Sequence, residues 1–211
     1  MPRKWLLLNM RKLVEKRVVL ASHNAGKLRE IQALLAPFGI DCTSAGELGL
    51  PEPAETEDSF AGNARIKAHF AASQSGLPAI SDDSGITIDA LDGAPGVYTA
   101  DWAETEQGGR DFVMAMTKVW GLLEGKVAPH PRLAQFRCTL CVAWPDGHDE
   151  IFEGIAPGSV TWPMRGEQGF GFDPMFVPNG HSRTFGEMTP AEKLPLTHRS
   201  DAFAKLVAGL F

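Results

Sequence analysis

Apolar and polar positions in the first half of the chain alternate between two repeating patterns. Short apolar runs, typical of buried strands, occur at residues 18–22, 40–44 and 79–80. Between and after the first two runs, apolar side chains recur at helical spacing. This predicts one helix that ends near Gly39 and another over residues 59–75. Strands that alternate with helices in this way favour an α/β fold.

The second half of the chain predicts a helix followed by a strand hairpin. Apolar spacing indicates a helix over residues 112–123, and two strand-like segments flank the turn residues 145–148. A Gly- and Pro-rich region covers residues 154–180, and a capping box with proline at the first helical position marks a short helix at 189–192. A final helix is expected over residues 200–208. Together with the first half, the hairpin predicts a mixed sheet.

Two adjacent carboxylates interrupt the apolar pattern in PAISDDSGITID, residues 78–89. Like charges side by side repel each other, and the cost rises if they are buried. One interpretation is a solvated turn, because Asp, Ser and Gly all favour turns. The other is that a positive group lies between Asp82 and Asp83, with a second strand following as ITIDAL. This segment alone leaves both interpretations open.

Composition narrows the classes of function. The 211 residues are 44% hydrophobic and carry a formal net charge of −6. These values are ordinary for a globular protein and do not suit a broad surface for nucleic acid or anionic lipid. The charge of a phosphate ligand would therefore have to be met by local cations or a metal ion. We expect no nucleic-acid partner and no membrane partner, since no apolar run approaches the length of a membrane span.

The start of the chain is basic and contains one short apolar stretch. That stretch is too short for a signal peptide and no cleavage site follows it, so we expect a cytoplasmic protein. Residues 1–17 are interpreted as an N-terminal extension that is dispensable up to residue 9, with Met10 as a candidate start. Residues 18–211 are expected to form a single domain.

The three cysteines do not predict a disulfide framework, because their number is odd. Cys138 and Cys141 form a CxxC pair within an alternating strand pattern. Residues three apart on a strand point to opposite faces, so these two thiols cannot share a metal ion. Packing is the favoured role for both cysteines.

Several segments carry residues suited to phosphate or metal chemistry. In residues 18–31, a strand, a loop and a helix with Lys27 form either a phosphate cradle or an ordinary helix start capped by Ser22 or Asn24. The loop is not a Walker A motif, because the first glycine and the Ser or Thr after the lysine are missing. Residues 192–202 place cations at a helix N-terminus, which favours an anionic or electron-rich ligand.

Taken in order, these segments resemble the inosine triphosphate pyrophosphatase family, which hydrolyses non-canonical purine nucleoside triphosphates. The resemblance runs from residue 18 to the C-terminus. The matching segments are Ser-His-Asn-Ala-Gly-Lys at 22–27, Glu-Thr at 55–56, Phe60, Asn-Ala at 63–64, Lys-Ala at 67–68, Ser-Asp-Asp-Ser-Gly at 81–85, Gly-Ala-Pro-Gly-Val-Tyr at 93–98, Gly-Phe-Gly-Phe-Asp-Pro at 169–174, Glu-Lys at 192–193 and Thr-His-Arg at 197–199. Each match is modest alone, but the ordered set is highly specific.

The resemblance implies an elongated α/β fold, in which a long mixed sheet with helices on both sides floors a cleft between two lobes. It also implies a homodimer, Mg²⁺, and hydrolysis of ITP, dITP or XTP to the monophosphate and pyrophosphate. Asp83 would be the catalytic residue and a metal ligand, and Glu55 the second metal carboxylate, with Glu52 as a competitor for that role. The substrate-binding residues that the resemblance implies are Ser22, His23, Asn24, Ala25, Gly26, Lys27, Lys67, Ser84, Phe170, Gly171, Phe172, Asp173, Lys193, His198 and Arg199.

Four positions depart from the commoner family pattern: Gly62 replaces a glutamate, Asp101 an arginine, Phe172 a tyrosine and Leu194 an asparagine. None of these changes removes a candidate for metal binding or hydrolysis. A dication beside the adjacent Asp pair would explain how both carboxylates remain ionised.

Two other functions compete with this assignment. A haloacid-dehalogenase-type phosphatase also places an aspartate after an apolar strand, but it needs a second Asp two positions later, where this chain has Ser84. A non-catalytic nucleotide-binding regulator would bind without turnover, and the intact acidic pair argues against it. The products formed from ITP distinguish all three.

Overall fold

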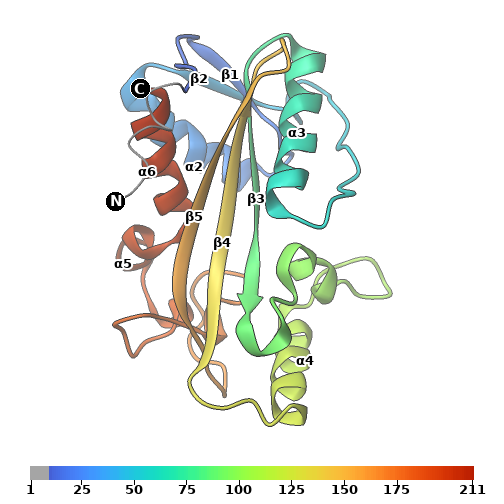
Figure 1. Cartoon of the computed structure of the whole chain (residues 1–211), viewed down its shortest axis with the longest axis vertical. Coiled ribbons are helices and arrows are strands. Elements are labelled where there is room, and N and C mark those ends of the chain that lie inside the picture. The colour runs from blue at the N-terminus through green and yellow to red at the C-terminus, as the bar shows by residue number, and fades with distance from the viewer. Residues whose placement is uncertain (1–9) are drawn as a thin grey trace. The chain divides into compact units, whose positions relative to one another are not determined.

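The computed structural model describes residues 10–211, apart from the side chains of residues 25, 26 and 30, so the predicted dispensability of residues 1–9 lies outside the described residues. Its strands form one mixed sheet in the order β2-β1-β3-β4-β5-β6, which confirms the predicted α/β class (Figure 1). The chain divides into two compact units. Unit 1 contains the chain up to Asp83, Thr139–Glu153 and Ala202–Phe211, and unit 2 contains Ser84–Cys138 and Gly154–Asp201.

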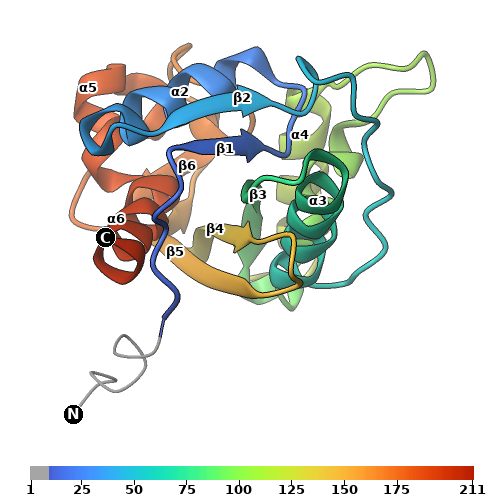
Figure 2. The ribbon, with the colours of Figure 1, turned by 90° about the horizontal axis from the view of Figure 1, so that it is seen from above.

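Unit 1 begins with the alternating pattern that the sequence predicts. Strand β1 (Arg17–Leu20) pairs in parallel with β2 (Asp41–Ser44) and with β3 (Ala79–Ile88), and Figure 2 shows β1 and β2 side by side. Helix α2 (Ala25–Leu35) connects β1 to β2 through a short 3-10 turn. The parallel pairing follows from this helical crossover, because parallel strands need such a connection.

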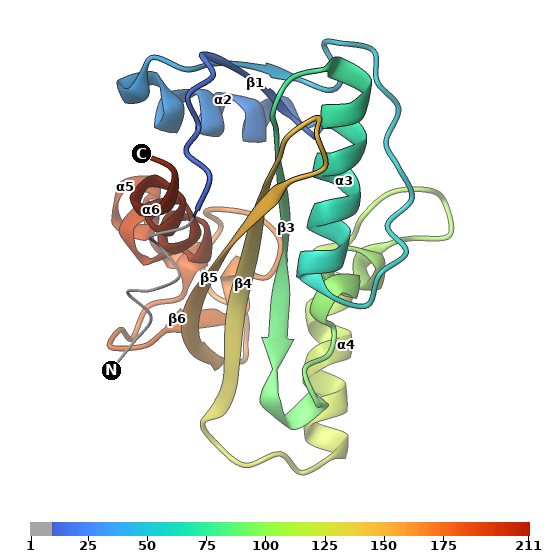
Figure 3. The same cartoon turned by 45° about the horizontal axis from the view of Figure 1, so that its top comes forward.

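Helix α3 (Phe60–Ser75) packs on the sheet of unit 1 through small side chains. The Ser59 side chain accepts a hydrogen bond from Gly62 N at the start of α3, and Gly76 ends it in a left-handed conformation, close to the predicted bounds. Four alanines of α3 belong to a buried cluster with Val19, Ala79 and residues of β4 and β5. Small side chains let the helix axis approach the strands closely, as Figure 3 shows for α3 and β3.

The chain before β1 also packs within unit 1. Leu13 is buried, and its amide donates to Leu210 O at the end of α6 (His198–Leu210). Lys12 Nζ donates to Gly209 O, and Trp144 Nε1 donates to the Glu15 carboxylate. Residues 10–17, assigned to an extension by sequence, therefore contribute contacts to this unit.

Unit 2 contains α4 (Phe112–Gly125), the short α5 (Pro190–Lys193) and the antiparallel pair of β5 (Asp149–Val160) and β6 (Phe176–Pro178). Strand β4 (Arg132–Ala143), like β3 and β5, has residues in both units. The core of unit 2 is aromatic, and its most buried large side chains include Phe172, Phe176 and Phe185. The capping box at Thr189 and the proline start of α5 are present as predicted.

Three stretches differ from the sequence interpretation. Strand β3 is continuous, so the Asp pair lies inside a strand rather than in a turn. Residues 96–103, for which the sequence predicted no helix or strand, contain two 3-10 turns, and the Gly- and Pro-rich region includes the end of β5 and all of β6. Strand β6 has only three residues and ends in a proline, so its sequence signal is weak, which explains why it was not predicted.

The three cysteine thiols are buried, in agreement with a packing role. Burial raises the pKa of Cys141 to about 12, which keeps its thiol protonated. Among residues 10–211, none of the helices has both the length and the apolar character of a membrane span.

Candidate active site

The adjacent aspartates of β3 each have their own lysine. Asp82 and Asp83 are both buried in a continuous strand, where successive side chains point to opposite faces. Lys27 Nζ lies 2.8 Å from Asp82 Oδ1, and Lys67 Nζ lies 2.8 Å from Asp83 Oδ1. The turn interpretation is therefore wrong. Each carboxylate thus has a positive group beside it, a lysine of α2 for Asp82 and a lysine of α3 for Asp83.

Lys67 also brings a second carboxylate into the site, because its Nζ lies 2.9 Å from Glu55 Oε1. Burial favours the neutral amine of Lys67, but Asp83 and Glu55 outweigh this effect and raise the pKa of Lys67 above its ordinary value. At the Asp83 carboxyl group, burial has the larger effect. Burial, only partly offset by Lys67, raises the pKa of Asp83 to about 6.

One oxygen of Asp83 has capacity for another partner. Oδ2 is buried and has no hydrogen-bond partner among the described residues, while Oδ1 is bound to Lys67. Buried polar atoms are nearly always satisfied, so an unpaired oxygen in a carboxylate-rich site indicates a missing ligand. Carboxylate oxygens are hard donors that suit Mg²⁺, which binds through one or two carboxylates and substrate oxygens. Asp83 and Glu55 therefore fit a magnesium ion.

A dedicated metal cage is not formed by side chains alone. Among the side chains that the structure describes, no group of three or more His, Cys, Asp or Glu residues is placed to hold a metal ion. This agrees with a metal held by few protein ligands, as is usual for Mg²⁺ that also binds substrate phosphates.

The loop between β1 and α2 is organised by its own polar side chains. Ser22 Oγ accepts a hydrogen bond from Asn24 N, and Asn24 Oδ1 accepts one from Lys27 N at the start of α2. His23 contacts Glu52 Oε1 at 2.9 Å and Leu50 O at 2.7 Å. Glu52 thus holds the loop, whereas Glu55 shares a lysine with Asp83, which favours Glu55 as the second metal carboxylate.

In unit 2, an exposed ring lies beside a buried ion pair. Asp173 is 3% exposed, and its Oδ2 accepts hydrogen bonds from Lys193 Nζ and from Phe170 N. The Lys193 ammonium lies 5.2 Å from the centre of the Phe170 ring and 5.1 Å from that of Phe185. Phe170 is 70% exposed. Its ring is therefore a surface on which a planar group could stack, with a fixed cation at one side.

Other predicted residues of unit 2 have different surroundings. Phe172 is buried in the core and contacts Phe112 edge-on, so its ring is not available for stacking on a ligand. The His198 ring stacks on Phe136 with centroids 5.1 Å apart. Ser84 and Arg199 are half-buried.

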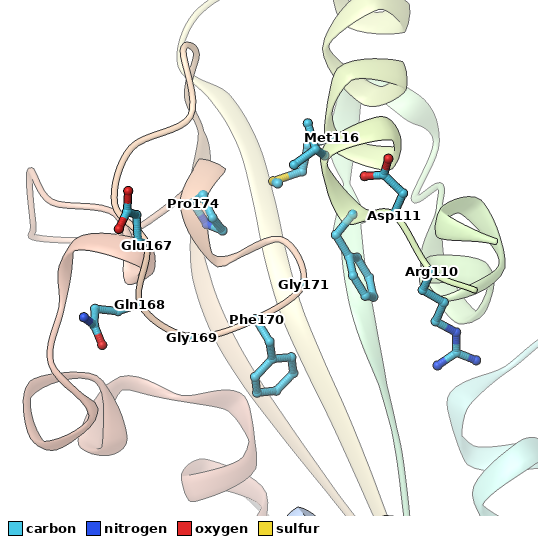
Figure 4. Close-up of a pocket in the computed structure, with 11 residues that line it drawn as sticks. Arg110, Asp111, Met116, Glu167, Gln168, Gly169, Phe170, Gly171 and Pro174 are labelled. Carbon is cyan, nitrogen blue, oxygen red and sulfur yellow. The ribbon is translucent and has the colours of Figure 1, made fainter. Parts of the chain in front are cut away.

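A cavity of about 500 Å³ adjoins Phe170 within unit 2. Figure 4 shows that its walls come from the start of α4 and from the loop that carries Phe170. Its charged and polar side chains come from Arg110, Asp111, Glu167 and Gln168, none of which was a candidate site residue from the sequence. They lie in segments whose polar residues are typical of any loop, so their pattern gave no signal.

A family model described as the Ham1 family matches residues 18–209. The chain belongs to the Ham1 family. Two relatives named dITP/XTP pyrophosphatase are very similar to it. The protein from Ruegeria pomeroyi is 66% identical over 92% of this chain and 95% of its own length, and the one from Rhodopseudomonas palustris is 54% identical over 93% and 97%. These matches confirm the family resemblance seen in the sequence.

Solved structures of Ham1 proteins share the fold. A HAM1 protein from Coxiella burnetii is 37% identical, with a TM-score of 0.85 over 91% of this chain and 96% of that one. A nucleoside-triphosphatase / dITP/XTP pyrophosphatase from Mycobacterium abscessus is 35% identical, with a TM-score of 0.74 over 90% and 98%. The ITPase-like fold is therefore confirmed.

The structure shows the environment of each of the four residues that depart from the commoner family pattern. Gly62 leaves room for the side chain of Glu57, since a Cβ at residue 62 would lie 2.5 Å from Glu57 Cβ. Phe172 replaces a tyrosine at a position that is only 1% exposed, where a hydroxyl would need a buried partner. Asp101 begins a 3-10 turn, and Leu194 is 60% exposed.

Proposed function

We propose that this protein hydrolyses the non-canonical purine nucleoside triphosphates ITP, dITP and XTP, in a Mg²⁺-dependent reaction, to the monophosphate and pyrophosphate. Its family and the names of its relatives identify it as a nucleoside triphosphate pyrophosphatase. The observation that carries the proposal is the arrangement of Asp83 and Glu55 around Lys67, with one Asp83 oxygen left unpaired.

Asp83 is the proposed general base. The reaction breaks the anhydride bond between the α- and β-phosphates, and a water oxygen forms the new bond to phosphorus. Asp83 Oδ2, which has no other hydrogen-bond partner among residues 10–211, would accept the proton of that water. Without bound metal, burial raises the pKa of Asp83 to about 6, so its carboxylate is mostly ionised at neutral pH. Lys67 holds the other oxygen and so fixes the carboxylate.

When bound, Mg²⁺ neutralises phosphate charge and makes a coordinated water more acidic. Asp83 and Glu55 are the residues proposed to hold it. Because the chain carries a net charge of −6, the triphosphate must be met by local groups. Lys27, Lys67 and the backbone N–H groups at the start of α2 are the proposed phosphate ligands, since a helix N-terminus attracts anions.

Phe170 and Lys193 are the proposed base-binding residues of unit 2, together with His198 and Arg199. An aromatic ring stacks on any purine, so it gives affinity without selectivity. Arg199 can only donate hydrogen bonds, which suits the 6-oxo group of hypoxanthine or xanthine better than the 6-amino group of adenine. We therefore expect a specificity constant for ITP far above that for ATP, because a mismatched buried polar group is costly.

One assay tests the reaction class. The protein is incubated with ITP and Mg²⁺, and the products are separated and identified. IMP with pyrophosphate is the expected result. IDP with inorganic phosphate would support a phosphatase instead, and calorimetric binding of ITP without products would support a regulator. Omission of Mg²⁺ should abolish turnover, and equal specificity constants for ATP and ITP would contradict the proposed selectivity.

The family resemblance also underlies the expectation of a homodimer, whereas the expectation of a cytoplasmic location rests on the N-terminal sequence. The first is checked by light scattering of the purified protein.

A further inference from the structure

Asn63 lies in the first turn of α3 and is only 3% exposed. The oxygen and the nitrogen of its side-chain amide are both hydrogen-bonded to the same residue of the preceding segment. Oδ1 accepts a hydrogen bond from Glu57 N at 3.0 Å, and Nδ2 donates to Glu57 O at 3.1 Å. This two-point contact resembles the pairing of two strand residues, and it fixes the backbone at residue 57 against the helix.

The segment that Asn63 holds also carries Glu55. Glu55 lies two residues before the clamped backbone, so its Cα cannot lie more than about 7 Å from that of residue 57. Its carboxylate contacts Lys67, which is four residues after Asn63 and therefore on the same face of α3. The clamp and the ion pair thus tie one short segment to two successive turns of one helix.

Gly62 allows this close approach. A Cβ at residue 62 would lie 2.5 Å from Glu57 Cβ and 2.6 Å from Glu57 Cγ, distances at which one of the two groups must move. The contact involves the inner part of the Glu57 side chain, so rotation of the carboxylate alone would not relieve it. The glycine at a position where the family often has glutamate is therefore required by the path of residues 55–58.

The same turn of α3 also holds the strand that carries the aspartates. Ser81 is fully buried and its Oγ donates to Ala64 O at 2.6 Å. Ala64 follows Asn63, and Ser81 precedes Asp82 and Asp83. Figure 3 shows α3 alongside this part of β3. The first turn of α3 is thus the common attachment of the Glu55 segment and of the aspartate pair.

We infer that Asn63 is a positioning residue that sets Glu55 against Lys67 and Asp83, and thereby fixes the spacing of the two metal-site carboxylates. This inference rests on the proposed function. Asn63 does not act on substrate, because both ends of its amide are engaged by Glu57. Residues that orient metal ligands are typically worth about 10- to 100-fold in metal affinity or activity.

The test is a double-mutant cycle of Asn63→Ala and Glu55→Gln, with two readouts. The first is binding of Mn²⁺ alone, followed by the paramagnetic resonance of the free ion. The second is kcat and KM for ITP at saturating Mg²⁺. We expect Asn63→Ala to weaken Mn²⁺ binding about tenfold and to lower kcat more than it raises KM. In the Glu55→Gln background the same change should have almost no further effect, since Asn63 acts through Glu55.

Hydrogen–deuterium exchange tests the clamp itself. Peptides that cover residues 52–60 should exchange faster in Asn63→Ala. Gly62→Ala should do the same and should also weaken Mn²⁺ binding, because its Cβ would displace the Glu57 side chain and with it the segment that carries Glu55. A melting curve of each variant separates positioning from general loss of structure. If Asn63→Ala does not fold, Asn63→Ser and Gly62→Ala carry the test.

Gln32→Ala is the matched control. Gln32 is another residue of unit 1 whose side-chain amide donates a hydrogen bond to the backbone, in this case from Nε2 to Cys42 O in β2. It should leave Mn²⁺ binding unchanged. Additive losses in the cycle, or unchanged exchange in Asn63→Ala, would overturn the inference, and so would a wild-type protein that binds no Mn²⁺. If the wild type binds Mn²⁺ but does not hydrolyse ITP, only the proposed function is contradicted. The double-mutant cycle measured by Mn²⁺ binding still tests the role of Asn63.

Discussion

Two buried aspartate–lysine pairs, one in each unit, use the same residue types for different purposes. In unit 1, Lys67 contacts Asp83, and in unit 2, Lys193 contacts Asp173. Both aspartates are less than one tenth exposed, at 8% and 3%. Each lysine is also largely buried, so both pairs have lost most of their hydration.

The difference lies in what else surrounds the carboxylate. Asp83 has an unpaired oxygen and two acidic neighbours, and burial together with these neighbours raises its pKa to about 6. At Asp173, one oxygen accepts both Lys193 Nζ and Phe170 N, and the lysine lies between two aromatic rings. A carboxylate with spare capacity can accept a proton or a cation, whereas one that is already bonded fixes the groups around it. The comparison predicts that the two pairs respond differently to the same substitution.

The largest effect is expected for Asp83→Asn. The amide cannot take a proton near neutral pH, and general-base assistance is typically worth about 10²–10⁴ in rate. The change is nearly isosteric and removes a buried charge next to other acids, so the melting temperature should not fall. Hydrolysis of ITP, calorimetric binding and a melting curve measure these quantities. Turnover near that of the wild type would remove Asp83 from the catalytic role.

Phe170→Ala should mainly affect binding. Stacking of a base on an aromatic ring is typically worth about 1–3 kcal/mol, which corresponds to roughly 5- to 150-fold in KM. Because the ring is 70% exposed, its removal should cost little stability. Steady-state kinetics with ITP check this, and Phe170→Tyr is the control that keeps the ring. A fall in kcat at unchanged KM would show that the ring does not bind the base.

Asp173→Asn should lower stability, in contrast to Asp83→Asn. The amide oxygen can still accept from Phe170 N, but the charged bond to Lys193 is lost. Hydrogen bonds to charged groups contribute about 1.5–3 kcal/mol, so the melting temperature should fall by several degrees. KM for ITP should rise by less than in Phe170→Ala. If Asp173→Asn were as stable as the wild type, the contrast between the two pairs would fail.

Most of the fold could be predicted from sequence, because long periodic segments specify their own structure. Helix α3 was predicted almost residue by residue, since its alanine stripe, its Ser59 cap and Gly76 all agree. The Asp pair was harder. Turn-forming residues favoured a break there, and only the lysines of α2 and α3, distant in sequence, explain why β3 continues through it.

The candidate site was predicted through the family resemblance, and the contacts within it were not. Sequence indicated Lys67 and Asp83 but gave no reason to pair Lys27 with Asp82 or Lys193 with Asp173. Phe172 was assigned to substrate binding from its motif, yet its ring packs in the core. Neighbours in a motif can face opposite environments, and only the backbone path between Gly169 and Asp173 decides which ring is exposed.

Asp82→Asn should have the smallest effect of the four substitutions. Asp82 shares the strand and the charge of Asp83 and is itself buried, but its partner Lys27 is nearly one third exposed, at 31%. Solvent therefore screens the pair, and we expect its loss to cost about as much as that of an exposed ion pair, typically about 0.2–1 kcal/mol. We expect kcat for ITP to fall by no more than about fivefold on that basis. KM should stay constant or decrease, since a lysine released from a carboxylate can bind a phosphate with a charge-assisted hydrogen bond. Measurement of both constants at several salt concentrations checks this, because the released charge should make KM more sensitive to salt. A loss of turnover as large as that of Asp83→Asn would mean that both carboxylates are needed for catalysis. The two aspartates would then not have different roles, although each has its own lysine.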